Sequence, residues 1–288
     1  MTDNMNIQWY PGHMTKTRRQ IEADLKLVDA VCEIVDARIP VSSRNPDIDA
    51  ICGDKPRMIV LNRMDLADPA ATKKWAEYFR RKGMAVIATD CKSKKGISAF
   101  TPAARLACAE KLERDAKRGM NRPLRGMVVG IPNVGKSTLI NQISGRKSAK
   151  AENRPGVTRG KQWVTVDSGL QLLDTPGILW PKFEDPEVGM MLAYTGAVKE
   201  GVIDLEELAY RLMELLHKFY PQTLLERYKV EALEGTSGWQ LLEMAGRKRG
   251  YLVSGGEVNT ERMAKVLLDE FRSGKLGNFT LEMPEDMV

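Results

Sequence analysis

The segment GIPNVGKST, at residues 130–138, is the most informative part of this sequence. It matches the pattern GxxxxGKS, follows the apolar run GMVV and opens the helical pattern KSTLINQIS. Gly130 and Gly135 let the backbone curl so that its N–H groups face phosphate oxygens. Lys136 can then reach the β and γ phosphates, and the Ser137 hydroxyl can hold Mg²⁺. The context of strand, loop and helix predicts a phosphate-binding loop.

Two further segments after the loop fit a nucleotide triphosphate. In LLDTPG, Asp174 ends an apolar run, where its carboxylate can hold magnesium through water, and Gly177 can offer its N–H to the γ phosphate. In RPGVTRG, Thr158 can add a hydroxyl to the magnesium from a loop that switches. A turn after a strand and a plain surface loop are the respective alternatives.

A candidate base site precedes the phosphate loop along the chain. In VLNRMD, Asn62 and Asp65 follow an apolar run, and the Asp65 carboxylate can accept both N–H groups at N1 and N2 of guanine, which adenine lacks. The loop in IATDCKSKKG can back the base through the main-chain N–H groups of Thr89, Asp90 and Cys91. The base element therefore comes first and the phosphate loop second, the reverse of the ordinary order.

Apolar runs and helical patterns alternate through the first two thirds of the chain. Strands are expected at 30–37, 57–62, 84–89, 126–131, 162–166 and 170–175. Helices are expected at 68–83, with Asp68 as N-cap, and at 97–117. This alternation predicts an α/β domain with a mostly parallel sheet and helices on both faces. From residue 186 helical patterns dominate, at 204–220 and 260–274, so we expect a nucleotide domain at 1–185 and a small all-helical domain at 186–288.

Composition and charge narrow the class of protein. The 288 residues are 43% hydrophobic and 28% charged, which is typical of a soluble globular protein. No apolar run is long enough to cross a bilayer, and the first residues lack a signal-peptide pattern, so we expect a cytoplasmic protein without membrane contact. Cys32, Cys52, Cys91 and Cys108 are widely spaced and are expected to be free thiols. The net charge of +6 comes from residues 1–199, because residues 200–288 are net acidic.

Taken together, the motifs resemble those of circularly permuted P-loop GTPases, and most of all the ribosome biogenesis GTPase A (YlqF/RbgA) family. The resemblance extends over nearly the whole chain through WYPGHM, DARIP, NRMD, GIPNVGKST, RPGVT, LLDTPGILWPK and SGGEVNTERMAKVLLDEFRSGKLG. It implies a GTPase that binds an immature large ribosomal subunit, both RNA and protein, in its GTP state and leaves after hydrolysis. The nucleotide-binding residues would be Asn62, Arg63, Asp65, Thr89, Asp90, Cys91, Asn133, Val134, Gly135, Lys136, Ser137, Thr138 and Gly177.

Two positions depart from the family pattern. Arg63 stands where the family has Lys, and its stem can still lie along the base, so a preference for GTP with altered affinity is expected. The backing loop lacks the usual Ser-Ala pair, which leaves its register open by one residue.

The group that orients the attacking water is not obvious from the motifs. Ile178 follows DTPG where a Ras-like enzyme has Gln. Of the two histidines, His217 lies in a helical pattern and is expected to be structural, whereas His13 of WYPGHM is the catalytic candidate that the resemblance favours, with an exposed packing role as the alternative. Lys136 and Thr158 complete the catalytic candidates. An Asn at the position of Asn133 helps bind K⁺ in other GTPases, so potassium-stimulated hydrolysis is a hypothesis.

Short basic runs are the candidate RNA contacts, and solvated surface is the alternative for each of them. They are Lys16, Arg18, Arg19, Lys92, Lys94, Lys95, Arg247, Lys248 and Arg249. The reversed order also makes DTPG the last nucleotide element before the helical domain, so the orientation of that domain is expected to depend on GTP or GDP. We expect a monomer off the ribosome. A regulatory GTP-binding module acting through protein partners is the competing function; an ATP-using enzyme conflicts with Asn62 and Asp65.

Overall fold

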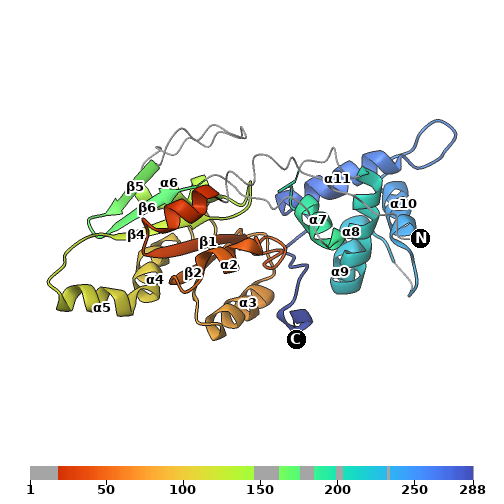
Figure 1. The fold of residues 1–288 in the computed structure, drawn as a ribbon. Coiled ribbons are helices and arrows are strands. Elements are labelled where there is room, and N and C mark those ends of the chain that lie inside the picture. Colours follow the sequence, from red (N-terminus) through yellow and green to blue (C-terminus); the bar gives the residue numbers. More distant parts are fainter. Residues whose placement is uncertain (1–18, 146–161, 176–184, 199–203, 232–233, 288) are drawn as a thin grey trace. The chain divides into compact units, whose positions relative to one another are not determined.

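The computed structural model describes residues 19–145, 162–175, 185–198, 204–231 and 234–287 (Figure 1). These residues form two compact units. The nucleotide unit contains the described residues up to 175 together with the segment from Glu282 onward, and the helical unit contains those from Asp185 to Leu281. None of the helices in the described part of the chain has the length and apolarity to span a bilayer.

One six-stranded sheet organises the nucleotide unit, with the order β3-β2-β1-β4-β6-β5. The strands are β1 (Ala30–Asp36), β2 (Arg57–Asn62), β3 (Ala85–Thr89), β4 (Leu124–Val129), β5 (Gln162–Asp167) and β6 (Leu170–Asp174). All neighbours pair in parallel except β5 with β6, which form an antiparallel edge. The predicted mostly parallel sheet is therefore confirmed.

The strand register brings polar residues to one edge of the sheet. Asp36 of β1 pairs with Asn62 of β2, and Asn62 pairs with Thr89 of β3. All three lie at the carboxyl ends of their strands, the edge at which ligands of open α/β sheets bind. The phosphate loop follows β4, the other neighbour of β1, so it leaves the sheet at the same edge.

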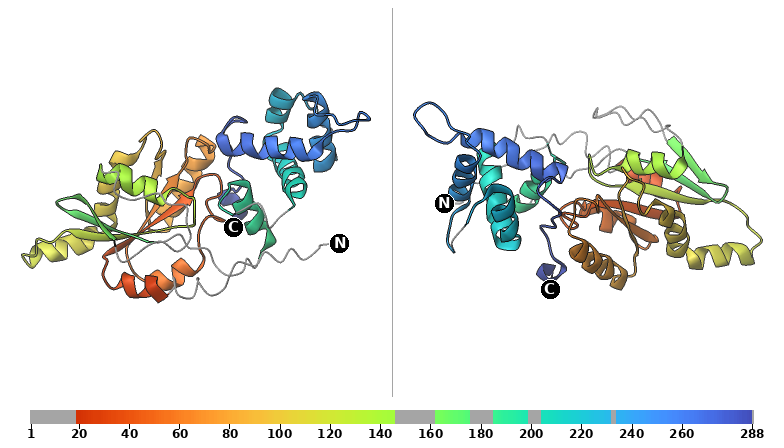
Figure 2. Two further views of the ribbon diagram at one scale, coloured as in Figure 1. Left: turned by 90° about the horizontal axis from the view of Figure 1, so that it is seen from above. Right: turned by 180° about the vertical axis from the view of Figure 1, so that it is seen from behind.

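Helices cover both faces of this sheet (Figure 2). They are α2 (Asp47–Cys52), α3 (Pro69–Arg81), α4 (Phe100–Ala107), α5 (Ala109–Lys117) and α6 (Lys136–Ser144), with the 3-10 helix η1 (Ile97–Ala99) before α4. On one face, residues 19–25, α2 and α3 bury apolar side chains such as Ile21 and Trp75 against β1, β2 and β4. On the other face, α4 brings Phe100 and Ala104 over Cys32 and Met58.

Local signals set several helix ends. The Asp68 carboxylate accepts hydrogen bonds from the N–H groups of Ala70 and Ala71, and Pro69 occupies the first helical position, as predicted. The helical pattern expected at 97–117 is present, but it is divided among η1, α4 and α5. The break lies at Cys108, where φ is −108° and ψ is 17°.

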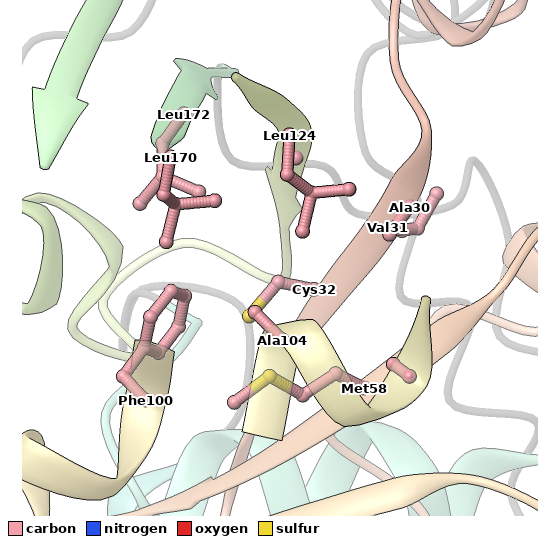
Figure 3. A pocket seen from close by; sticks show the side chains of 11 residues that line it. Ala30, Val31, Cys32, Met58, Phe100, Ala104, Leu124, Leu170 and Leu172 are labelled. Carbon is pink, nitrogen blue, oxygen red and sulfur yellow. The ribbon is translucent and has the colours of Figure 1, made fainter. Parts of the chain in front are cut away.

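A small gap remains between α4 and the sheet (Figure 3). Its volume is about 10 Å³, and apolar side chains including Cys32, Met58 and Phe100 line it. A gap of this size and lining is at the lower limit for one water molecule and offers no polar partners. It is a packing defect and not a ligand site.

The helical unit is built around α8 (Leu205–Phe219). The other helices are α7 (Pro186–Tyr194), α9 (Pro221–Tyr228), α10 (Gly238–Lys248) and α11 (Thr260–Ser273). The Asp204 side chain caps α8, and Glu207 pairs with Arg211 one turn later. Gly274 ends α11 with φ 77°, the left-handed conformation that glycine adopts without strain.

Candidate nucleotide-binding site

The phosphate loop connects β4 to α6 through two glycines in tight surroundings. A Cβ at Gly130 would lie 2.6 Å from the carbonyl oxygen of Ile34, and a Cβ at Gly135 would lie 2.4 Å from Nδ2 of Asn62. Gly135 is also the N-cap of α6, with φ 105°. Because α6 begins at Lys136, the orphan N–H groups of its first turn are available to an anion.

Lys136 is the buried cation of this loop. Its Nζ donates to the carbonyl oxygens of Gly130 at 2.9 Å and Ile131 at 2.8 Å. Burial lowers the pKa of Lys136 to about 8, and the carboxylate of Asp174 opposes that shift. The pKa of Asp174 is raised by its own burial, although Lys136 and a hydrogen bond from the backbone of Thr175 act against the rise. A buried ammonium therefore lies in the electrostatic field of a half-buried carboxylate at the end of β6.

Asn62 connects the base element to the phosphate loop. Its Nδ2 donates to the carbonyl oxygen of Val134 at 2.7 Å, although the two residues are 72 positions apart in the chain. Its Oδ1 accepts from the Thr89 hydroxyl at 3.1 Å and from the Cys91 N–H at 3.4 Å. Asn62, Thr89 and Cys91 are all buried. One amide thus ties together the phosphate loop, the base element and the backing loop.

Arg63 makes a second connection between the same elements. Its Nη2 donates to the carbonyl oxygen of Asn133 at 2.7 Å, and its Nε lies 3.7 Å from Oδ2 of Asp36. Burial lowers the pKa of Arg63, and Asp36 counteracts it. Both Arg63 and Asn133 have φ near 60°, the left-handed conformation. Arg63 therefore contacts the phosphate loop through its long, forked side chain.

The remaining base-site candidates surround this cluster. Asp65 is exposed three residues after Asn62. In the backing loop, Asp90 is buried, its N–H donates to the carbonyl oxygen of Lys95 at 3.0 Å, and its Oδ1 accepts from the N–H of Lys92 at 2.8 Å. These bonds close a tight turn at 90–95, so the segment that would back the base has a fixed shape.

The oxygen ligands available to magnesium are few. Ser137 and Thr138 are half-buried in the first turn of α6, and Asp174 lies near Lys136. Within the described ranges there is no group of three or more His, Cys, Asp or Glu side chains able to hold a metal. When the phosphates of a substrate supply the other oxygen ligands, a protein needs to offer Mg²⁺ only one carboxylate and one hydroxyl. The donor set fits a nucleotide-bound magnesium better than a metal cage.

Several predicted residues lie outside the part of the chain that the structure describes: His13, Lys16, Arg18, Thr158 and Gly177. His217 is half-buried near the end of α8, in the helical unit. Among the basic candidates, Arg19, Lys92, Lys94, Lys95 and Lys248 are exposed. Arg247 pairs with Glu243, and Arg249 pairs with Glu270 and lies over the Tyr228 ring.

Two residues of the DARIP motif lie beside the site, although the motif alone did not indicate a role for them. Asp36 and Arg38 are buried, and Arg38 binds the Asp36 carboxylate through Nε at 3.0 Å and Nη2 at 2.8 Å. These bonds and the nearby Arg63 hold the pKa of Asp36 below its usual range against the effect of burial. The available signal was the position of Asp36 at the end of a strand, level with the expected base element.

The sheet order, the glycine-shaped loop between β4 and α6, and the buried amide between that loop and the base element define a P-loop GTPase domain in permuted chain order. A family model described as "50S ribosome-binding GTPase" matches residues 125–224. "Ribosome biogenesis GTPase A" of Priestia megaterium is 45% identical over 284 residues, which are 98% of each chain.

Two solved structures match nearly the whole chain at 30% sequence identity. A GDP-bound YlqF structure has a TM-score of 0.68 and covers 93% of this chain and 100% of its own. GNP-bound YlqF from T. maritima has a TM-score of 0.65 and covers 94% and 99%. The chain belongs to the ribosome biogenesis GTPase A family, as the motifs predicted, and it is a GTPase of ribosome assembly.

Proposed function

We propose that the protein hydrolyses GTP while bound to an immature large ribosomal subunit and leaves the particle after hydrolysis. The family membership supports the class of reaction and the setting. The single observation that supports the site is the 2.7 Å hydrogen bond from Asn62 Nδ2 to the Val134 carbonyl, which joins the two elements that one nucleotide would span. GTP and GDP are the ligands of this site.

Guanine recognition rests on Asp65, with Asn62, Arg63 and the loop Thr89–Cys91 around it. The Asp65 carboxylate accepts the N1 and N2 hydrogens of guanine. Asn62 is already committed on both sides of its amide, so it acts as a brace that keeps the base element against the phosphate loop. Arg63 places its aliphatic stem along the base while its guanidinium stays on Asn133.

The phosphates lie across the loop from Asn133 to Thr138. The backbone N–H groups of the loop and of the first turn of α6 donate to phosphate oxygens, with Gly177 as a candidate donor to the γ phosphate. Lys136 gives up its loop carbonyls for phosphate oxygens, a better set of partners for a buried ammonium. Bound magnesium, which Ser137, Thr158 and Asp174 would hold, supplies charge neutralisation for the β and γ phosphates.

Hydrolysis requires a water in line with the γ phosphate, and His13 is the proposed group that orients it or takes its proton. Lys136 stabilises the charge that builds up on the transferred phosphoryl group. Replacing His13 by Ala should lower turnover on the ribosome and leave GDP affinity unchanged. An equal loss of GDP affinity would assign the histidine to binding instead.

Potassium stimulation is the finer part of the proposal. Asn133 is exposed in the phosphate loop, two residues before Gly135, and adopts the left-handed conformation. A K⁺ ion held there would add positive charge at the place where other GTPases receive an arginine. Turnover in K⁺ should exceed turnover in Na⁺ for the wild type but not for Asn133→Ala. Equal rates in both salts would remove the potassium role.

Pelleting with immature large subunits tests the function as a whole. The protein should co-sediment in the presence of a non-hydrolysable GTP analogue and stay in the supernatant with GDP, and ATP should not replace GTP. The exposed cations Arg19, Lys92, Lys94, Lys95 and Lys248 are the described candidates for RNA contact, and binding should weaken with salt. GTP binding without any pelleting would favour a regulatory module that acts through protein partners. We also propose that the protein is cytoplasmic and that it is a monomer when it is not bound to the ribosome.

A further inference from the structure

The segment Glu282–Met287, which we call the latch segment, follows the last residue of the helical unit yet belongs to the nucleotide unit. The Glu282 carboxylate accepts from the N–H of Val41 at 2.6 Å and from the N–H of Ser42 at 3.0 Å and 3.2 Å, through both of its oxygens. Two adjacent backbone N–H groups that share one carboxylate form a small anion-binding site. Glu282 occupies that site from a distance of about 240 residues along the chain.

The rest of the latch segment lies against α3. The indole N–H of Trp75, a side chain with no exposed surface, donates to the Glu282 carbonyl oxygen at 2.8 Å. The 3-10 helix η3 (Pro284–Met287) contacts α3, as the dark blue segment in Figure 1 shows. Lys74 and Glu285 form an exposed ion pair at 2.9 Å, a type of contact that contributes little to stability. Glu282 therefore holds the segment through both its carboxylate and its backbone carbonyl.

Val41 and Ser42 belong to the turn that follows β1, and this turn supports the base site. The Ser43 hydroxyl accepts from the N–H of Asp36 at 2.9 Å. Asp36 in turn binds Arg38 and lies beside Arg63, which contacts the phosphate loop at Asn133. Burial raises the pKa of Glu282, and the nearby charge of Asp36 contributes to that rise. A continuous series of contacts runs from Glu282 to the phosphate loop.

The residues just before the latch segment are fixed within the helical unit. The Tyr220 hydroxyl donates to the Thr280 carbonyl at 2.9 Å and accepts from the Thr280 N–H at 3.0 Å. Phe279 stacks on Phe271 and meets Tyr220 edge to face. Only Leu281 separates Thr280, held in one unit, from Glu282, held in the other. The segment from Thr280 to Glu282 is short, because two residues span at most about 7 Å.

We propose that the latch segment couples the helical unit to nucleotide affinity, with Glu282 as its anchoring residue and the turn at 41–43 as its docking site. When Glu282 is bound, the turn holds Asp36, and Asp36 keeps Arg63 against the phosphate loop. A partner that pulls on the helical unit would loosen the anchor and so weaken the grip on the nucleotide. The inference rests on the proposed nucleotide site, but it assigns to this segment a role that the motifs do not contain.

Glu282→Gln in the full chain tests the coupling, with Glu285→Gln as the matched control. A glutamine keeps the shape but presents one acceptor oxygen to two N–H groups, so hydrogen exchange of Val41 and Ser42 should speed up. GDP should bind about fivefold more weakly, at the lower end of the coupling found between sites in one protein. The control removes only the exposed pair and should alter neither measurement.

Two results would overturn the inference. Faster exchange at 41–42 with unchanged GDP affinity would reduce the latch to a structural contact, and unchanged exchange would show that Glu282 does not hold the turn. The affinity change should also vanish when Arg63→Ala is already present, because the series of contacts is then cut. Where Glu282→Gln gives no folded protein, Glu282→Asp keeps the charge and retracts it by one methylene. The preference for GTP over ATP separates this inference from the proposed nucleotide site. If only the coupling proposal is wrong, every variant still prefers GTP to ATP.

Discussion

Replacement of Gly135 by alanine would disturb the point at which the base element and the phosphate loop meet. Two separate costs are expected. The φ of 105° is unfavourable for any residue with a Cβ, at about 1–2 kcal/mol. The new Cβ would also lie 2.4 Å from Asn62 Nδ2, so the buried amide must move and lose its bonds to Val134 and Thr89. Two such hydrogen bonds contribute about 1 kcal/mol each.

Gly145→Ala is the matched control at the other end of the same helix. Gly145 has φ 63°, and a Cβ there would meet nothing within 4 Å. Gly145→Ala is therefore expected to lose stability only through the unfavourable φ angle. Urea unfolding should show a loss of about 1–2 kcal/mol for Gly145→Ala and about 3–4 kcal/mol for Gly135→Ala. Since GDP binding needs the Asn62 amide back in place, calorimetry should show GDP affinity about 30-fold lower for Gly135→Ala only.

A double variant separates the two costs. In the Asn62→Ala background the clash partner is gone, so Gly135→Ala should then cost only the backbone term of about 1–2 kcal/mol. If Gly135→Ala destabilises the protein no more than Gly145→Ala, or if Asn62→Ala leaves its cost unchanged, the contact between Asn62 and the loop is not what shapes the site.

Three further outcomes are expected. Asp65→Asn should weaken GTP binding by about 100-fold or more and favour xanthosine triphosphate, as competition binding would reveal. The C2 carbonyl of xanthine accepts from the Asn amide where the guanine N2 amino group would donate, while N1–H still donates to the Asn oxygen. Retained guanine preference would place the base elsewhere. Burial lowers the pKa of Lys136 to about 8, and a bound phosphate would keep the Lys136 ammonium protonated. Above pH 8, nucleotide binding should therefore take up a proton and weaken about tenfold per pH unit. Calorimetry in two buffers measures the proton uptake, and constant affinity from pH 8 to 9.5 would contradict the prediction. Burial raises the pKa of Cys52, Cys91 and Cys108 to about 11 and that of Cys32 further. Mass spectrometry should therefore find the folded protein unmodified by iodoacetamide at pH 8 and all four thiols alkylated in urea. Fast labelling of the native state would mean that a thiol is accessible.

Features with a local physical cause were predictable from the sequence. Asp68 caps α3 because its carboxylate reaches N–H groups two and three residues away, and such a contact depends on nothing distant. The strand ends at Asn62 and Asp174 follow from apolar runs and their limits. The division of 97–117 was not predictable, because it depends on packing: α4 buries Phe100 and Ala104 against the sheet, whereas α5 has no buried residue to keep it on the same axis.

The candidate site was predictable in its motifs but not in its connections. That Asn62 and the phosphate loop share one sheet edge follows from parallel strands, yet the bond from its amide to Val134 depends on β1 lying between β2 and β4. Arg63 was expected on the base, while its contact with Asp36 required the register of β1 against β2. Glu282 carries no local signal, since an acidic residue in a polar segment is ordinarily solvated, and its partners lie at the opposite end of the sequence.

The reversed order of the motifs leaves the site intact because the contacts that define it are between strands and not along the chain. β2 delivers the base element and β4 the phosphate loop to the two sides of β1, and neither strand needs to come first. What the order changes is the route out of the domain. β6, whose last residue Asp174 interacts electrostatically with Lys136, is the last strand of the sheet among the described residues, and the chain reaches the helical unit soon after it. With the proposed latch, the chain would join the helical unit to the nucleotide unit at two points, one after β6, whose Asp174 is a proposed magnesium ligand, and one at the turn 41–43. A device attached at both ends of the nucleotide can respond to the γ phosphate and act on affinity in the same step.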